Sequence, residues 1–305
     1  MQVDRREFLA VIAAAPLAQR VEPPRTRIIL LGTRGGPRVE KEGRRSSAVV
    51  LLVNGVPYLV DCGYGTSRQL LAAGVRLDTV RYMFITHHHS DHNLEYGPLF
   101  YNGWVGGAPV RVDAYGPPGL QAMTEAFFDY MKIDIDTRMV DEGRTDPRTR
   151  LFPHDLKESG LVMQNDDVKV TAARVPHPMI KDAFAYRFDA ADRSVVISGD
   201  TAYSTALADL AKGADVLVHE VMHLSGIDAL LKRVPNAARL REHLLVSHST
   251  PEEVGKVAMK AGVGMLVLYH FVPADDPSLS EDQWIEGVRK HYKGRVVAGR
   301  DLMEL

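Results

Sequence analysis

The sequence predicts an α/β fold, and three observations support this prediction. Short apolar runs typical of strands recur along the chain, and amphipathic segments typical of helices lie between them. Several of the apolar runs stop at a histidine or an aspartate, which would collect polar side chains at one edge of the sheets. Finally, 305 residues with 45% hydrophobic content can bury one large core. We therefore expect one α/β domain, residues 26–305, behind a short leader.

The leader, residues 1–18, has the features of an export signal. Arg5 and Arg6 precede Phe8-Leu9 and an apolar run, a pattern that resembles a twin-arginine signal, although Asp4 stands where Ser or Thr is usual. Residues 19–25 would be a linker, and no other segment is long and apolar enough to span a bilayer. We expect a periplasmic or secreted protein. An uncleaved anchor is the alternative, because Pro16 follows Ala13-Ala-Ala15 and leaves the cleavage site poorly defined.

The domain is expected to open with a strand at 27–31 and a glycine-rich loop at 32–37. A glycine-rich loop alone is weak evidence for phosphate binding, so we expect a tight loop beside the site described next. Strands at 48–53 and 56–60 are joined by Asn54-Gly55, a strong hairpin signal. A helix should then run from Thr66 to about Ala73.

The next apolar run, 80–85, ends at the pattern His87-x-His89-x-Asp91-His92. Residues two apart at a strand end point the same way, so His87 and His89 could bind one ion from one side. Asp91 and His92 would fall on the following turn and face a second ion. Imidazole and carboxylate ligands suit zinc, with iron and manganese as alternatives. A solvated histidine tract fits poorly, because the preceding run is too apolar for a tail or linker.

Further elements follow from the same patterns. Residues 134–153 mix both charges with Thr and Pro, and we expect a solvated excursion there rather than a loop that covers the substrate. Thr250, Pro251 and Glu253 form the N-terminal signature of a helix. We expect strands at 109–115, 168–175, 183–188, 194–197, 215–220, 265–270 and 294–301, and helices at 120–131, 205–211 and 281–292.

The histidine motif resembles that of the metallo-β-lactamase superfamily of dinuclear metallohydrolases. That family also needs a lone His, an Asp and a last His at strand ends, and His177, Asp200 and His270 follow apolar runs in that order. The resemblance implies two Zn²⁺ ions per chain. One would be held by His87, His89, His177 and Asp200, and the other by Asp91, His92, Asp200 and His270. It also implies a four-layer αβ/βα sandwich, two facing mixed sheets with helices on both outer faces.

Two more motifs, Leu31-Gly-Thr33 and Asp61-Cys-Gly-Tyr-Gly-Thr66, look like the ribonuclease Z branch, and the same opening resembles secreted zinc arylsulfatases. In ribonuclease Z-like proteins the counterparts of Glu220 and His248 are assigned to proton transfer and phosphate contact. Asp91 could orient the nucleophile. From the residues alone, Glu220 and His248 would be a surface pair and a helix cap. No role is expected for the remaining histidines, His88, His154, His223, His243 and His291.

The resemblance favours an exported zinc hydrolase that cleaves a small phosphodiester or related ester through a metal-bridging hydroxide. An aryl sulfate, a β-lactam or a lactone is the alternative substrate. A tRNA substrate is not expected, because the formal charge of −2 gives no footprint for a polyanion and residues 178–199 leave no room for a tRNA-gripping arm.

A non-catalytic scaffold is the alternative of a different class, but such members usually lack several ligands. A homodimer is compatible with the sequence. The single cysteine, Cys62, excludes an intrachain disulfide, and we expect it to be a buried small residue.

Overall fold

A computed structural model of the chain describes residues 26–107 and 111–305. The predicted leader and linker lie outside the described residues, as does the start of the strand expected at 109–115.

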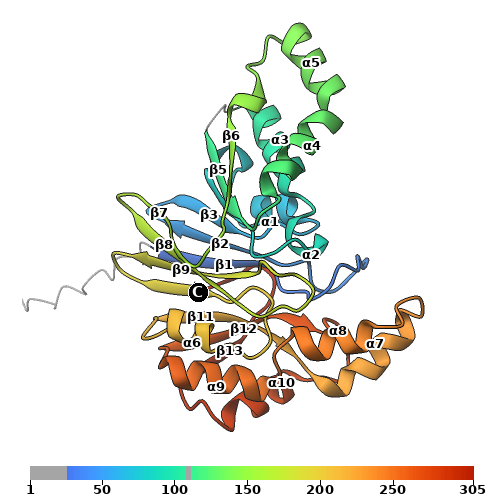
Figure 1. Cartoon of the computed structure of the whole chain (residues 1–305), viewed down its shortest axis with the longest axis vertical. Helices are drawn as coiled ribbons and strands as arrows, with labels where there is room; N and C mark the ends of the chain where they lie inside the picture. Colours follow the sequence, from blue (N-terminus) through green and yellow to red (C-terminus); the bar gives the residue numbers. More distant parts are fainter. Residues whose placement is uncertain (1–25, 108–110) are drawn as a thin grey trace, which may run out of the picture.

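The described residues form two seven-stranded mixed sheets that face each other (Figure 1). The first has the order β14-β1-β2-β3-β4-β5-β6, and the second has the order β13-β12-β11-β10-β9-β8-β7. The strands of the first sheet are β1 (Thr26–Gly32), β2 (Ala48–Val53), β3 (Val56–Val60), β4 (Tyr82–Phe84), β5 (Val112–Gly116), β6 (Leu151–Asp155) and β14 (Met303–Glu304). Those of the second are β7 (Gly160–Gln164), β8 (Val168–Arg174), β9 (Phe184–Ala190), β10 (Ser194–Ile197), β11 (Val216–Met222), β12 (Met265–Val272) and β13 (Arg295–Ala298).

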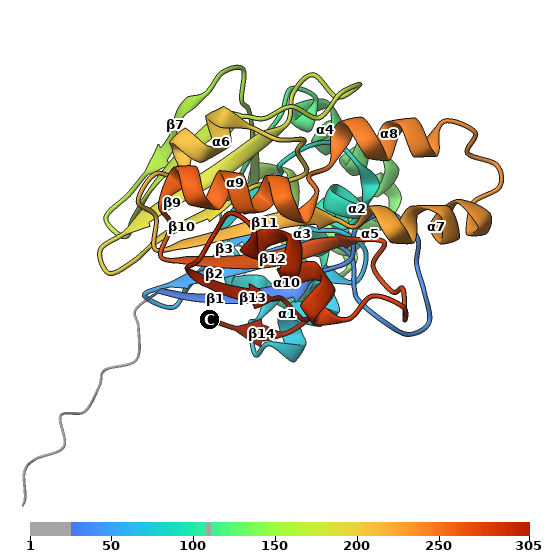
Figure 2. The ribbon, with the colours of Figure 1, turned by 90° about the horizontal axis from the view of Figure 1, so that it is seen from below.

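Helices cover the outer faces of both sheets, which gives the expected four layers (Figures 1 and 2). The α-helices are α1 (Thr66–Ala72), α2 (Ser90–Asn93), α3 (Tyr96–Gly106), α4 (Leu120–Tyr130), α5 (Lys132–Asp141), α6 (Thr205–Leu210), α7 (Ile227–Arg233), α8 (Leu240–Ser247), α9 (Pro251–Ala261) and α10 (Glu281–Arg289). The short 3₁₀ turns are η1 (Leu77–Thr79), η2 (Pro147–Thr149) and η3 (Leu224–Gly226).

Three apolar cores account for this layering. The central core joins the inner faces of the sheets and includes Phe84, Phe188 and Val267. A second core packs the β10–β13 side of the second sheet against α6, α9 and α10. A third packs the first sheet against α1, α3 and α4. Alternating strand residues supply opposite faces of each sheet, as the periodicity predicts.

Residues 134–153 are largely exposed or half-buried, as a solvated excursion would be, but most of this stretch is regular structure, which we did not expect. It contains α5, η2 and most of β6. The charges that suggested a solvated excursion pair at helical spacing: Lys132 with Asp136 at 2.7 Å, and Arg138 with Asp134 at 3.0 Å. Ile135 is fully buried and fixes one face of the helix.

We also did not predict α3, β7, α7, α8 or β14 from the sequence. The terminal strand β14 pairs with β1, so the chain end returns to the first sheet after β13 has closed the second. Among the described residues, no helix is long and apolar enough to cross a membrane.

Candidate metal centre

The predicted ligands come from both sheets and meet at one edge of the sandwich. His87 and His89 follow β4, and Asp91 and His92 lie in the short helix α2. His177 follows β8 and Asp200 follows β10, while His270 lies within β12. The β11–β12 register shifts beside His270, whose φ of 45° marks a local irregularity that aims its ring out of the strand pattern.

The structure brings all seven predicted ligands together in two neighbouring groups, and a third group, Asp200, His248 and His270, shares a member with each of them. His87, His89, His177 and Asp200 place one donor atom each within 4.8 Å of one another. Asp91, His92 and His270 do the same. His87 Nε2 lies 3.0 Å from His89 Nδ1, and His92 Nε2 lies 3.1 Å from His270 Nε2. Asp200 lies between the groups, 3.7 Å from His87 Nε2 and 3.2 Å from His270 Nε2.

Hydrogen bonds behind the imidazole rings set their orientation. His92 Nδ1 donates to Asp61 Oδ2 at 2.7 Å, and His177 Nδ1 donates to the Ser247 carbonyl at 3.1 Å. Thr86 Oγ1 lies 3.0 Å from His87 Nδ1 and donates to Asp61. With Nδ1 occupied in each ring, Nε2 faces the cluster with its lone pair, which is the arrangement of metal-ligating histidines.

These residues therefore fit a pair of zinc-like ions. Asp200 Oδ1 is buried without a hydrogen bond of good geometry, although Nε2 of His92 and of His270 lie 3.3 and 3.2 Å away. Several imidazole nitrogens and a carboxylate oxygen point into one buried space with no hydrogen-bond donor between them. A bound cation would satisfy these lone pairs.

Burial sets the protonation of the first group. It lowers the pKa of His177 to about 4 and that of His87 well below its usual value, so both rings are neutral, the form that binds metal. Burial would raise the pKa of Asp200, but His270 and His92 outweigh it and hold that pKa well below the usual range. Burial would lower the pKa of His92, but Asp200 and Asp61 raise it. Metal binding would displace the proton on His92.

His248 and Glu220 form a buried pair beside the ligands. His248 Nδ1 lies 3.2 Å from Glu220 Oε1 and 4.0 Å from Asp200 Oδ2. Burial alone would lower the pKa of His248, but the ion pair with Glu220 raises it to about 9. Glu220 is fully buried and His248 is 6% exposed, so the surface pair expected from the residues alone was wrong. The helix cap is Thr250, whose side chain forms a capping box with Glu253.

Backbone amides hold the two carboxylates that are not shared between the groups. Thr201 N and Ser249 N each donate to Glu220 Oε1 at 3.1 Å. Gly36 N donates to Asp91 Oδ2 at 2.8 Å, so the glycine-rich loop is a tight loop beside the site, as expected. A Cβ at Gly35 would lie 2.4 Å from Val272 Cγ2 and 3.0 Å from His270 Cε1, which explains the need for glycine there.

The sequence interpretation missed two residues. His243, given no role above, lies on α8 with its ring centroid 5.7 Å from those of His89 and His177. Its position five residues before His248 was the only signal. Asp61 was noted as part of a motif, but its bond to His92 spans 31 residues and could not be predicted from spacing.

A cavity of about 530 Å³ opens directly onto the ligands. His89, Asp91, Asp200, His243 and His248 contribute to its lining. The remaining lining comes from the loop at 34–40, from α7 and α8 with the loop between them, and from residues 272–275.

Comparisons with known proteins agree with this fold. Residues 57–271 match the model of the β-lactamase superfamily domain. The chain is 30% identical over 278 residues to a ribonuclease Z of Mycobacterium bovis, covering 90% of this chain and 96% of that one. Among solved structures it is similar to the metallo-β-lactamase fold protein YhfI of Bacillus subtilis, with a TM-score of 0.67, 18% identity and coverage of 93% and 99%. It is also similar to the short form of human tRNase Z, with a TM-score of 0.64, 22% identity and coverage of 92% and 98%.

Proposed function

Because the chain belongs to the β-lactamase superfamily, with ribonuclease Z among its relatives, we propose that it hydrolyses small phosphodiesters at a two-zinc site outside the cytoplasm. The family shows that the protein is a metal-dependent hydrolase of the phosphodiesterase-like kind. The observation that carries the choice of a phosphodiester is the buried His248–Glu220 pair, 3.2 Å apart, next to Asp200. It matches the residues that the ribonuclease Z branch adds to the shared ligand set.

The metal ions, when bound, would polarise an ester oxygen and supply a nucleophile at neutral pH. The protein's own residues divide the remaining work. His248, protonated and held by Glu220, donates its proton to the departing alcohol oxygen. Asp91, fixed by the Gly36 amide, orients the attacking oxygen. Asp91, Glu220 and His248 are buried, which strengthens each of these polar contacts.

Two observations support a small substrate. The cavity of about 530 Å³ is the size of a small-molecule site. Residues 178–199, where an RNA-gripping arm would be inserted, instead supply β9 and β10.

RNA is the second candidate. The relatives named ribonuclease Z and the solved tRNase Z favour it, against the sequence-based expectation that tRNA is not a substrate. An aryl sulfate, a lactone and a β-lactam remain further alternatives at the same site.

A substrate panel separates these candidates. Zinc- and manganese-loaded protein should be assayed with bis(p-nitrophenyl) phosphate, p-nitrophenyl sulfate, an aryl lactone, a chromogenic cephalosporin and a tRNA precursor with a 3′ trailer. We expect the phosphodiester to have the highest kcat/KM, and we expect Asp200→Ala to abolish turnover while His291→Ala, far from the ligands, does not. If another substrate had the highest kcat/KM, that substrate class would replace the phosphodiester in the proposed function. No turnover of any substrate in the panel would favour a non-catalytic scaffold.

Export rests on the leader, and its test does not depend on the substrate. We expect a reporter fused to residues 1–25 to leave the cytoplasm through the folded-protein pathway. Changing Arg5 and Arg6 to Lys should keep the reporter inside. Equal export of the double variant would remove the twin-arginine assignment.

A further inference from the structure

One wall of the cavity is apolar, and two helices with no expected role form it. Helices α7 and α8 lie side by side and project beyond the second sheet (Figures 1 and 2). Leu230 and Val234, from α7 and its C-cap, line the cavity together with Leu240 and Leu244 of α8. Leu244 and Val272 are buried and pack in one small core with Ile227, which fixes this wall to the second sheet.

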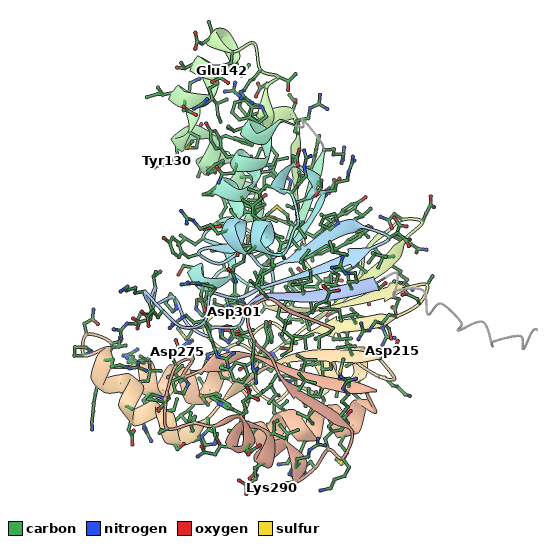
Figure 3. All side chains as sticks on the ribbon, turned by 180° about the vertical axis from the view of Figure 1, so that it is seen from behind. Tyr130, Glu142, Asp215, Asp275, Lys290 and Asp301 are labelled. Carbon is green, nitrogen blue, oxygen red and sulfur yellow. The ribbon has the colours of Figure 1, made fainter. Side chains whose placement is uncertain are left out.

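The facing wall is charged, but its charges are already paired. Arg34 bonds to Asp275, and Arg38 lies 2.8 Å from Glu40. Asp275 lies near the end of the molecule from which α7 and α8 project (Figure 3). Arg34 and Arg38 therefore have partners. Arg233 of α7 and Asn236 of the loop also line the cavity, so the apolar part of the α7–α8 side is the surface formed by four side chains, those of Leu230, Val234, Leu240 and Leu244. Apolar surface that faces an open cavity is stabilised by an apolar ligand group.

The position of this wall connects it to the reacting centre. His243 lies on α8 and His248 directly follows it, and both contribute to the same cavity as the leucines. A molecule whose anionic group lies at His89, Asp91 and Asp200 would therefore place an attached group against Leu240 and Leu244.

We propose that the α7–α8 hairpin forms an apolar subsite that binds one alcohol group of the substrate. The inference rests on the proposed function and narrows it: the substrates are phosphodiesters that carry an aryl group or an alkyl chain of several carbons. A sugar or a nucleotide would leave the apolar wall without a matching surface.

The test measures binding and needs no turnover. Methyl-, butyl-, hexyl- and phenylphosphonate are titrated calorimetrically into the zinc-loaded full chain. Burial of a methylene is worth ~0.8 kcal/mol, so the Kd should fall about three- to fourfold for each added carbon until the cavity is full. Methylphosphonate, which reaches only the polar end, gives the baseline.

Variants on one helix locate the effect. Leu240→Ser should flatten the dependence on chain length by removing apolar wall, and Leu240→Trp should block hexylphosphonate while methylphosphonate still binds. Leu245→Ser is the matched control, because Leu245 lies on the same helix but is 45% exposed and does not line the cavity. Leu230→Ser repeats the test from α7 if Leu240→Ser does not fold.

A Kd that is independent of chain length in the wild-type protein would overturn the subsite, as would equal flattening by Leu245→Ser. The outcome is separable from the substrate panel. A steep dependence on chain length with no phosphodiester turnover keeps the subsite and removes the proposed function. A Kd that does not depend on chain length, together with rapid phosphodiester turnover, keeps the proposed function and removes the subsite.

Discussion

Hydrogen bonds to Asp61, Thr86 and the Ser247 carbonyl decide which nitrogen faces the metal cluster in three of the ligand histidines, His92, His87 and His177. The ligands themselves could be predicted, because each follows an apolar run in a motif with fixed spacing. Their supporting partners could not. Asp61 is 31 residues from His92, and Ser247 is 70 residues from His177 and contributes a backbone atom that carries no sequence signal.

Asp61 should therefore control metal affinity without being a ligand. The carboxylate of Asp61 accepts hydrogen bonds from His92 Nδ1, Thr86 N and Thr86 Oγ1. Asn would keep the backbone conformation at φ 60° but would replace one of the two acceptor oxygens with an NH₂ group. We expect Asp61→Asn to weaken zinc binding ~10–100-fold in competition with a chelator. Asp113→Asn, which changes a similar Asp–His pair with His154 at 2.8 Å on β5 and β6, is the control. Equal zinc affinity of the two variants would refute the orienting role.

His248 should matter for turnover and not for metal content. Removal of a positioned proton donor typically costs ~10²–10⁴-fold in rate. We expect His248→Ala to lower kcat within that range while the zinc content measured by elemental analysis stays that of the wild type. His291→Ala should have the wild-type kcat. Full activity of His248→Ala would mean that the pair with Glu220 is structural.

At the scale of elements, most of the strands were predicted because their signals are local, although β6, β7 and β14 were not. The β2–β3 hairpin begins and ends where the two apolar runs and Asn54-Gly55 place it. The α9 capping box is also present as its three residues predict. The helices that were not predicted include α5, α7 and α8. Their exposed faces carry charges or exposed apolar residues, and tertiary contacts made by one or two buried residues per helix keep them in place.

Helix α5 provides a direct test of that explanation. Ile135 is fully buried, whereas Ile133 on the same helix is 84% exposed. We expect Ile135→Ala to lower the free energy of unfolding by ~2–5 kcal/mol through the cavity it leaves. Ile133→Ala should change it by less than ~0.5 kcal/mol. Denaturant titrations of the two variants would contradict the assignment if they gave the same midpoint.

At the scale of the whole molecule, the candidate metal centre joins the two sheets. His87, His89, Asp91 and His92 follow a strand of the first sheet, while His177, Asp200 and His270 belong to the second. The sequence predicted this convergence only through the family resemblance, since spacing alone does not show which strand ends face each other.

Metal removal should therefore destabilise the whole chain. A ligand that binds only the folded state stabilises it by ~2.7 kcal/mol at a hundredfold excess over its Kd. We expect a chelator to lower the Tm by several degrees, and added zinc to restore it. Zinc should also dissociate more readily as the pH falls, because the histidine ligands must be neutral to bind the metal. A Tm that does not respond to the chelator would mean that the ions do not link the sheets.

The central claim is that the seven predicted ligands hold two ions and that Asp200 serves both. Elemental analysis of the zinc-supplied wild-type protein beside Asp200→Ala tests this most directly. We expect close to two zinc ions per wild-type chain and a marked loss of zinc in the variant, with both proteins folded by circular dichroism. A wild-type chain without metal, or an Asp200→Ala chain that keeps both ions, would contradict it.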